Sequence, residues 1–306
     1  MKKTLLLLLS VLITITAFGE EFAPRKIHEY QMGTPSKGLY LRRYEEVAPQ
    51  DDISKNYLMF TKNGDLNIYQ ADTSRIIYLD KKWKIKKEDK LNLLIRPYNC
   101  MYTNNYLLLS DKSGRIYLFD MKLNRKAYFE TFYVLDTNNT GKWLAETYYD
   151  EATDILFFRD SDEVMHSLVH PGIDAKENHK NYKTPSETLE LFNSACDMKN
   201  LGLYKGKYLT VDEKVYYWAG TTINQINYQI FDNTRVNIWN SSKLKINCTA
   251  SDEEVESIAI HPSGDIYILR INWKTNSHNL YYVKNTWDSE WRTQWYKEHP
   301  SAAKPE

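Results

Sequence analysis

The chain repeats one pattern of apolar and polar positions five times. Each copy is a short apolar segment, a tight polar turn and a second segment that carries tyrosine or another large apolar residue. The clearest copy is Ser257–Leu269, and the others are Tyr57–Tyr69, Tyr106–Tyr117, Asp154–Met165 and Lys207–Trp218. Short apolar runs on either side of turn residues are typical of strands, so each copy predicts a β-hairpin.

The predicted turns lie at Gly64, Gly114, Asp162, Glu213 and Gly264, which are 50, 48, 51 and 51 residues apart. Three of these turns contain glycine, which supplies the positive φ that a tight hairpin needs. The other two use Ser-Asp and Asp-Glu pairs, which also suit turns. Five hairpins in one rhythm predict a repeat architecture with a period of about 50 residues.

Further strands are predicted after most of the hairpins, and one short helix is predicted at Ser186–Phe192. Four strands per repeat, with no amphipathic helix between them, are typical of a propeller blade. The sequence therefore predicts an all-β fold, a β-propeller of five four-stranded blades, with six blades as the alternative. The additional strands are expected at Arg75–Leu79, Leu91–Ile95, Ala127–Val134, Gln225–Phe231, Arg235–Trp239, Asn279–Val283 and Trp291–Tyr296.

The ends of such a ring must be joined, because an open end exposes unpaired strand edges. Leu39–Tyr44 reads as a lone strand, and we expect it to pair with the last blade. Residues 20–38 are predicted to form an exposed leader, residues 39–298 the propeller and residues 299–306 a disordered tail. Within each hairpin the first strand is expected nearest the axis, with the three glycine turns on one face of the disc.

The first 19 residues resemble a secretory signal. A cationic start, Met1–Lys3, precedes an uncharged apolar run, Thr4–Phe18, and small residues stand at Ala17 and Gly19. The apolar run is shorter than the roughly 20 residues that span a bilayer comfortably, so a cleavable signal peptide over residues 1–19 is favoured over an uncleaved anchor. The expected location is therefore the periplasm or the extracellular space, with no transmembrane segment after cleavage.

Composition agrees with an exported β protein. The chain has 24 Tyr, 8 Trp and 10 Phe, residues that suit half-buried strands. Without residues 1–19, 38 basic side chains face 40 acidic ones, so the net charge does not suggest nucleic acid as a partner. The three cysteines, Cys100, Cys196 and Cys248, lack the spacing of a zinc site, and we expect semi-buried thiols with at most one incidental disulfide.

Two stretches resemble a known repeat family. Ser257–Leu269, and less closely Tyr106–Asp120, are similar to the opening of an NHL-type propeller blade, in which an apolar strand meets a glycine turn and a tyrosine-bearing strand. The resemblance implies the propeller architecture. It implies no activity, since such propellers serve many unrelated functions.

Candidate catalytic acids and histidines can be named, but structural roles are favoured for them. The acids near the expected inner strands stand mainly at strand ends and turns, where aspartate serves local hydrogen bonding. His166, His170 and His179 are predicted to be solvated loop residues, and His261 to be structural, so no catalytic residue, metal site or cofactor is predicted. The acids are Asp51, Asp52, Asp111, Asp160, Asp162 and Asp212.

Four tryptophans remain as candidate ligand-binding residues. Trp218, Trp239, Trp273 and Trp287 stand at the ends of later strands beside amide and hydroxyl residues. Exposed tryptophan can stack on a sugar ring or hold a peptide, although packing between blades is the favoured explanation for such aromatics.

These observations predict an exported, non-enzymatic propeller that binds a protein or a glycan or serves as a scaffold. The alternative is an exported hydrolase of carbohydrates or lactones on the same fold, which requires carboxylates or a metal site converging in the channel. A purely structural component of the cell envelope is a third hypothesis.

The signal peptide leads to a direct test. N-terminal sequencing of the exported protein is expected to begin at or within a few residues of Glu20, because the apolar run is cleaved after small residues. Recovery of a membrane-bound form that starts at Met1 would instead identify an anchor.

Overall fold

The computed structural model describes the parts of the chain that form its sheets and C-terminal helix. They are residues 21–22, 24–41, 55–95, 97, 99–103, 105–111, 114–130, 144–150, 153–160, 162, 164–169, 182–188, 190–191, 208–218, 221–231, 237–239, 245–248, 252–286 and 289–305. The predicted signal peptide lies outside them.

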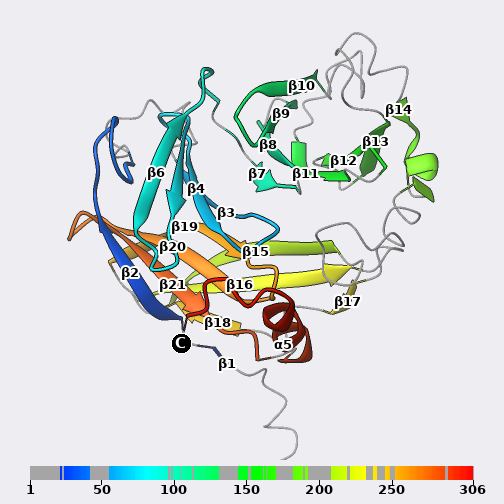
Figure 1. Cartoon of the computed structure of the whole chain (residues 1–306). Helices are drawn as coiled ribbons and strands as arrows, with labels where there is room; N and C mark the ends of the chain where they lie inside the picture. Colours follow the sequence, from blue (N-terminus) through cyan, green and yellow to red (C-terminus); the bar gives the residue numbers. More distant parts are fainter. Residues whose placement is uncertain are drawn as a thin grey trace, which may run out of the picture.

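The described part is all-β apart from short helical stretches (Figure 1). Residues 185–188 and 190–191 are helical, as predicted for Ser186–Phe192. The strands are β1 (Glu21–Phe22), β2 (Arg25–Gln31), β3 (Asn56–Phe60), β4 (Leu66–Gln70), β5 (Arg75–Leu79), β6 (Ile85–Lys90), β7 (Asn99–Tyr102), β8 (Tyr106–Ser110), β9 (Arg115–Asp120), β10 (Arg125–Glu130), β11 (Leu144–Asp150), β12 (Ile155–Asp160), β13 (Met165–Val169), β14 (Tyr182–Lys183), β15 (Tyr208–Trp218), β16 (Thr221–Phe231), β17 (Asn237–Trp239), β18 (Lys245–Cys248), β19 (Glu253–Ile260), β20 (Ile266–Asn272) and β21 (Ser277–Val283), and the C-terminal helix is α5 (Ser289–Glu298).

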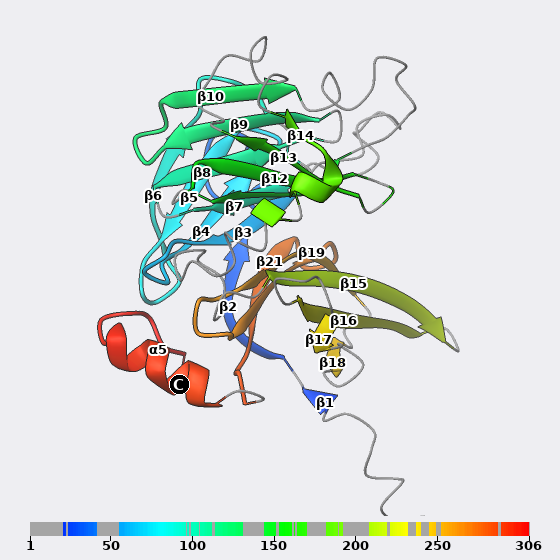
Figure 2. The ribbon, with the colours of Figure 1, turned by 90° about the vertical axis from the view of Figure 1, so that its right-hand side faces the viewer.

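Four of the sheets in this part are four-stranded and antiparallel. Three of them consist of strands consecutive in sequence: β3–β6, β7–β10 and β11–β14. The fourth has the order β19-β20-β21-β2, and a further sheet of five strands contains β15–β18 and β1. Successive sheets stand beside one another in both views (Figures 1 and 2).

The four four-stranded sheets pack face to face, and apolar clusters of the described residues fill the spaces between them. One cluster joins the β19–β21 sheet to the β3–β6 sheet, the second joins β3–β6 to β7–β10, and the third joins β7–β10 to β11–β14. Side chains alternate between clusters along a strand: Leu58 of β3 lies in the first, and Tyr57 and Met59 lie in the second. Because both faces of a sheet are buried, its strands read as continuous apolar runs. This sandwiched arrangement is that of propeller blades.

The three hairpins with glycine turns share one turn geometry. In the Gly64 turn the backbone N–H of Gly64 donates to Thr61 O, and that of Thr61 donates to Asp65 O. The Gly114 and Gly264 turns have the same pair of bonds, and all three glycines have a φ near 80°. A short hairpin loop with a left-handed residue in this place is a favoured type, which confirms the role predicted for these glycines.

The hairpins nevertheless occupy different places in their sheets. The Gly64 and Gly264 turns connect first and second strands, whereas the Gly114 turn connects the second and third strands, β8 and β9. The prediction that β8 and β12 are the first strands of their blades is wrong, since β7 and β11 precede them. The offset also contradicts one common face for the three turns, because successive turns of a meander alternate between the ends of its sheet. The same type of turn therefore connects different pairs of strands in different sheets. The spacing of about 50 residues between hairpins is not the repeat length of the blades.

The turn predicted at Glu213 is also wrong. Glu213 lies within β15, paired to Ile226 of β16, and the hairpin closes after Trp218, which pairs with Thr221. The polar residues of this strand resemble a turn in the sequence, but in the structure they pair with the neighbouring strand β16.

The ring-closing strand lies earlier in the chain than predicted. Arg25–Gln31 pairs with the last sheet through β21. Residues 39–41, the described part of the predicted strand Leu39–Tyr44, are not in a strand. Residues 25–31 thus form the outer strand of a sheet where the sequence suggested an exposed leader. Leu39 is fully buried in the first apolar cluster, which explains the apolar pattern that resembled a strand there.

Helix α5 replaces the strand predicted at Trp291–Tyr296. Arg292, Trp295 and Tyr296 lie on one side of this helix and contact the last sheet, with Arg292 Nε 2.8 Å from Asp265 Oδ1. Tyr296 Oη donates to the other oxygen of Asp265, at 3.0 Å. Spacings of three and four residues bring these side chains to one helix face.

The Gly64 turn packs tightly against this region, which predicts a difference between two glycine substitutions. A Cβ at Gly64 would lie 2.5 Å from His261 Nε2 and 2.7 Å from Trp295 Cη2, whereas one at Gly38, also at positive φ, has 3.5 Å to its nearest neighbour. We expect Gly38→Ala to cost about 1–2 kcal/mol of unfolding free energy from backbone strain, and Gly64→Ala about 1–3 kcal/mol more from overpacking.

Denaturant unfolding of both variants measures this difference. Equal losses of stability would contradict the close packing of the turn against His261 and Trp295.

Candidate functional site

The four candidate tryptophans do not come together in one place. Trp218 pairs with Thr221 at the start of β16, and Trp239 pairs with Ile230 near its end. Nine residues of extended strand separate these positions by about 30 Å. Trp273 lies in the turn between β20 and β21, half-buried, with its indole N–H 3.4 Å from Glu254 Oε2. Trp287 lies outside the described residues, and its ligand-binding role stays a prediction, as does that of the other three.

Two of the candidate acids, Asp111 and Asp160, accept hydrogen bonds within their own turns. Asp160 Oδ1 accepts the backbone N–H groups of Asp162 and Val164, at 2.9 and 3.0 Å. Asp111 accepts that of Arg115 at 3.0 Å. These bonds are the local use of aspartate that the sequence favoured. Asp212 lies in β15, and Asp51 and Asp52 lie outside the described residues.

The same turn recurs at Asp80 and Asp120, in equivalent positions between third and fourth strands. Asp80 Oδ1 accepts the N–H groups of Lys82 and Lys84, and Asp120 Oδ1 those of Lys122 and Asn124. Backbone donors lower the pKa of both carboxyls, that of Asp120 to about 2. They are therefore ionised turn acceptors rather than proton donors.

His166 is not the solvated loop residue that the sequence predicted. It lies in β13, 5% exposed, with Nε2 3.0 Å from Asp160 Oδ2 and Nδ1 2.5 Å from Tyr182 Oη. Both ring nitrogens are engaged within the sheet, which leaves neither for a metal or a substrate proton. His170 and His179 lie outside the described residues.

His261 is structural, as predicted. It is 1% exposed, and Nδ1 accepts the N–H of Ser263 at 3.1 Å, the position that an aspartate oxygen takes in the other turns. Its ring packs against Phe60 and Trp295. Burial lowers the pKa of His261 to about 4, so the imidazole is neutral at physiological pH.

Cys100 is a buried free thiol, 2.9 Å from Met59 Sδ. The structure describes neither Cys196 nor the side chain of Cys248.

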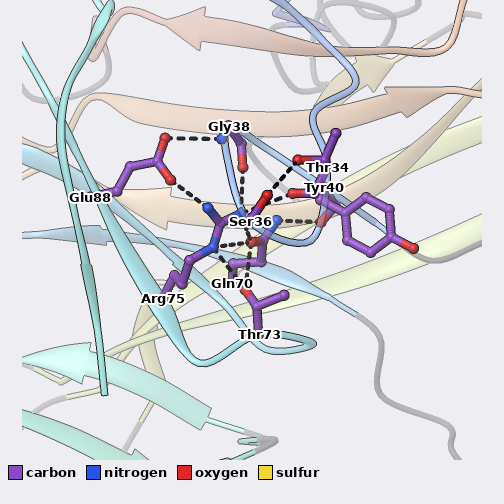
Figure 3. A network of polar contacts seen from close by, with 8 residues as sticks. All are labelled: Thr34, Ser36, Gly38, Tyr40, Gln70, Thr73, Arg75 and Glu88. Carbon is purple, nitrogen blue, oxygen red and sulfur yellow. Dashed lines mark hydrogen bonds and ion pairs between the residues drawn. The ribbon is translucent and has the colours of Figure 1, made fainter. Parts of the chain in front are cut away.

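A network centred on Arg75 fixes the N-terminal segment to the β3–β6 sheet (Figure 3). Arg75 is 5% exposed; Nη2 donates to the carbonyl oxygens of Thr34 and Gly38, and Nη1 contacts Glu88 Oε2 at 2.5 Å. The other oxygen of Glu88 accepts the N–H of Gly38 at 2.9 Å. All of these groups are used internally, so the network is a structural clasp.

The outer strand of this same sheet presents an exposed surface that is mainly positively charged. Six lysines, all exposed, lie within ten residues on β6 and the turn before it. Only Lys87 is within ion-pair distance of an acid among the described residues, at 2.5 Å from Asp89, and Glu88 turns inward to Arg75. We call this surface the lysine edge; it consists of Lys81, Lys82, Lys84, Lys86, Lys87 and Lys90.

The overall charge of the chain hides this surface, because 40 basic residues balance 40 acidic ones. The signal was the local run KKWKIKK at residues 81–87. Charge counted over short windows reveals such a run, whereas the net charge does not. That the run is one edge of a sheet follows only from the fold.

No family model matches the chain, and no curated protein matches it. Among solved structures, the glutaminyl cyclase of Myxococcus xanthus is similar with 12% identity over 86% of this chain and 97% of its own, at a TM-score of 0.37. A streptogramin B lyase has 13% sequence identity over 78% of this chain and 67% of its own, with a TM-score of 0.30. A chain of a mitotic checkpoint complex has 10% identity over 87% of this chain and 98% of its own, with a TM-score of 0.36. The resemblance to NHL-type repeats stays a prediction.

No helix among the described residues is long and apolar enough to cross a membrane. No group of three or more His, Cys, Asp or Glu residues is placed to hold a metal ion within that part of the chain.

The buried histidine predicts a pH dependence of stability. The unfolded chain protonates His261 near pH 6.5 and the folded chain only near pH 4, so stability falls as the pH drops through this window, by about 3 kcal/mol. In His261→Asn the amide oxygen can accept the Ser263 N–H but does not titrate.

Denaturant unfolding between pH 7 and pH 4 compares the two proteins. The variant is expected to be less stable at pH 7, having lost ring contacts, and to lose less stability on acidification. An identical loss in both proteins would show that His261 does not titrate as described.

Proposed function

We propose that this protein is an exported β-propeller of five blades that acts as a non-enzymatic binding scaffold. The lysine edge is proposed as a principal docking surface for its partner. Export rests on the signal-like residues 1–19, and the blade number rests on the four four-stranded sheets together with the β15–β18 sheet.

The observation that carries this proposal is the contrast between buried and exposed polar groups. Asp160 and His166 pair with each other inside their sheet, and Asp265 accepts hydrogen bonds from Arg292 and Tyr296 of α5. These charges stabilise the fold. The lysine edge, by comparison, holds five exposed lysines with no ion-pair partner in the described part of the chain.

A stack of rigid sheets with one strongly cationic edge is suited to recognition. Complementary charge raises association rates and excludes like-charged partners. The rival hypothesis, a carbohydrate or lactone hydrolase, needs acids whose oxygens are available to a substrate. Two of the candidate acids, Asp111 and Asp160, accept backbone hydrogen bonds within their own turns.

Site-specific photo-crosslinking in the native host tests the proposal. A photoreactive amino acid at Lys86 is expected to form a discrete adduct with a partner, whereas the same group at Lys274, an exposed lysine of the β20–β21 turn, is not. Equal labelling at both positions, or none at Lys86, would overturn the lysine edge as the docking surface.

The hydrolase hypothesis is tested in parallel. The purified protein is expected to show no turnover on a panel of glycosides and lactones. Turnover that Asp111→Asn or Asp160→Asn abolishes without loss of folding would establish the rival function.

A further inference from the structure

We propose that the lysine edge binds an acidic polypeptide segment in extended conformation, which adds to the sheet as a strand alongside β6. This inference rests on the proposed function and specifies the partner's chemistry and geometry.

The first observation is that β6 has a free edge. Its residues pair with β5 from Arg75↔Lys90 to Leu79↔Ile85. Within the described residues no other strand pairs with β6, and no backbone hydrogen bond of a turn or loop joins it to another segment. One row of peptide groups therefore faces outward, which is the template that β-strand addition uses.

The second observation is the spacing of the charges. Lys86 and Lys90 are four residues apart along β6, a span of about 13 Å in extended strand. Lys86 lies at a β-bulge, since Lys87 pairs with Tyr78 and Ile85 with Leu79, and Glu88 between the two lysines is turned to Arg75. The side chains of an added strand also alternate between its two faces, so its carboxylates can be placed opposite Lys86 and Lys90. Lys81, Lys82 and Lys84 continue the positive charge into the adjoining turn. Ile85 is 37% exposed between these lysines and provides an apolar contact for the intervening side chains.

The third observation is that the strand is held in place before any partner binds. Trp83, in the turn before β6, is buried in the first apolar cluster, and its carbonyl accepts the hydroxyl of Tyr30 at 2.6 Å. Glu88 is fixed by Arg75 and by the N–H of Gly38. A preorganised strand pays less ordering entropy on binding than a mobile one.

The charges also decide against a second copy of this chain. Lysines on an edge strand prevent edge-to-edge pairing of like molecules, and two copies of β6 would bring two lysine edges together. An acidic strand reverses the sign of that interaction. The same residues thus exclude self-association and select an acidic partner.

Fluorescence anisotropy with synthetic ten-residue peptides of alternating Glu and Val tests this on the full chain. We expect saturable binding that weakens with salt. Lys86→Glu combined with Lys90→Glu is expected to weaken it by about tenfold or more. The matched control, Lys274→Glu combined with Lys297→Glu, changes the net charge equally at exposed positions outside β6 and its turn and is expected to leave affinity within about twofold. Thermal melts of both doubles verify folding.

Backbone methylation separates strand addition from simple charge attraction. Methylation of alternate amides along one edge of the peptide keeps its charge but removes the donors that would pair with β6. Binding is expected to be lost for one methylated edge and retained for the other. Retention for both edges would overturn the added strand.

Other anionic probes identify which proposal fails. Lysine-edge-dependent binding of dextran sulfate or of phosphatidylglycerol vesicles, with no binding of the peptide, would overturn the acidic polypeptide while the binding function stands. Absence of binding by every probe, together with no adduct at Lys86 in the crosslinking experiment, would overturn both proposals.

Discussion

The structure depends on the face-to-face packing of sheets that are apolar on both faces. The β3–β6 sheet sends Leu58, Ile68 and Ile77 to one neighbour, and Met59 and Tyr69 to the other. No sheet of this kind can stand alone, because exposing either face would return a row of large apolar side chains to water. Stability is therefore shared between neighbours, as in repeat proteins, and aromatic residues fill much of the space between sheets.

This constraint gives the N-terminal segment its importance. β2 completes the last sheet, and Tyr30 then reaches the turn of the β3–β6 sheet through its bond to Trp83. Arg75 holds the following residues by their backbone carbonyls. A segment that lies at the start of the described chain thus joins the last sheet to the first, which is the place where a ring built from one chain must be closed.

The division between buried and exposed charge follows from the same packing. Charged side chains within the sheets are paired where the structure describes them, as Asp160 is with His166. On the outer strand β6 the lysines are exposed, whereas Glu88 turns inward to Arg75. On β6 those charges serve two purposes: they discourage pairing with like molecules, and in our proposal they recognise an acidic strand. The aspartates at the turns resemble catalytic acids in the sequence, but their carboxylates accept backbone hydrogen bonds within the hairpins.

The sequence by itself determined what is local. Apolar runs and glycine turns predicted the strands around Gly64, Gly114 and Gly264, because a hairpin of this type depends on a few neighbouring residues and on one positive φ. The all-β class and the short helix followed from the same kind of evidence. Only the tertiary structure decided which strand of a sheet each hairpin supplies, since one turn sequence fits any connection. It also decided that Arg25–Gln31 closes the last sheet, that Ser289–Glu298 is a helix held by Asp265, and that the lysine run forms a free edge. Each of these depends on contacts between residues far apart in the chain, whose energy is absent from any local pattern.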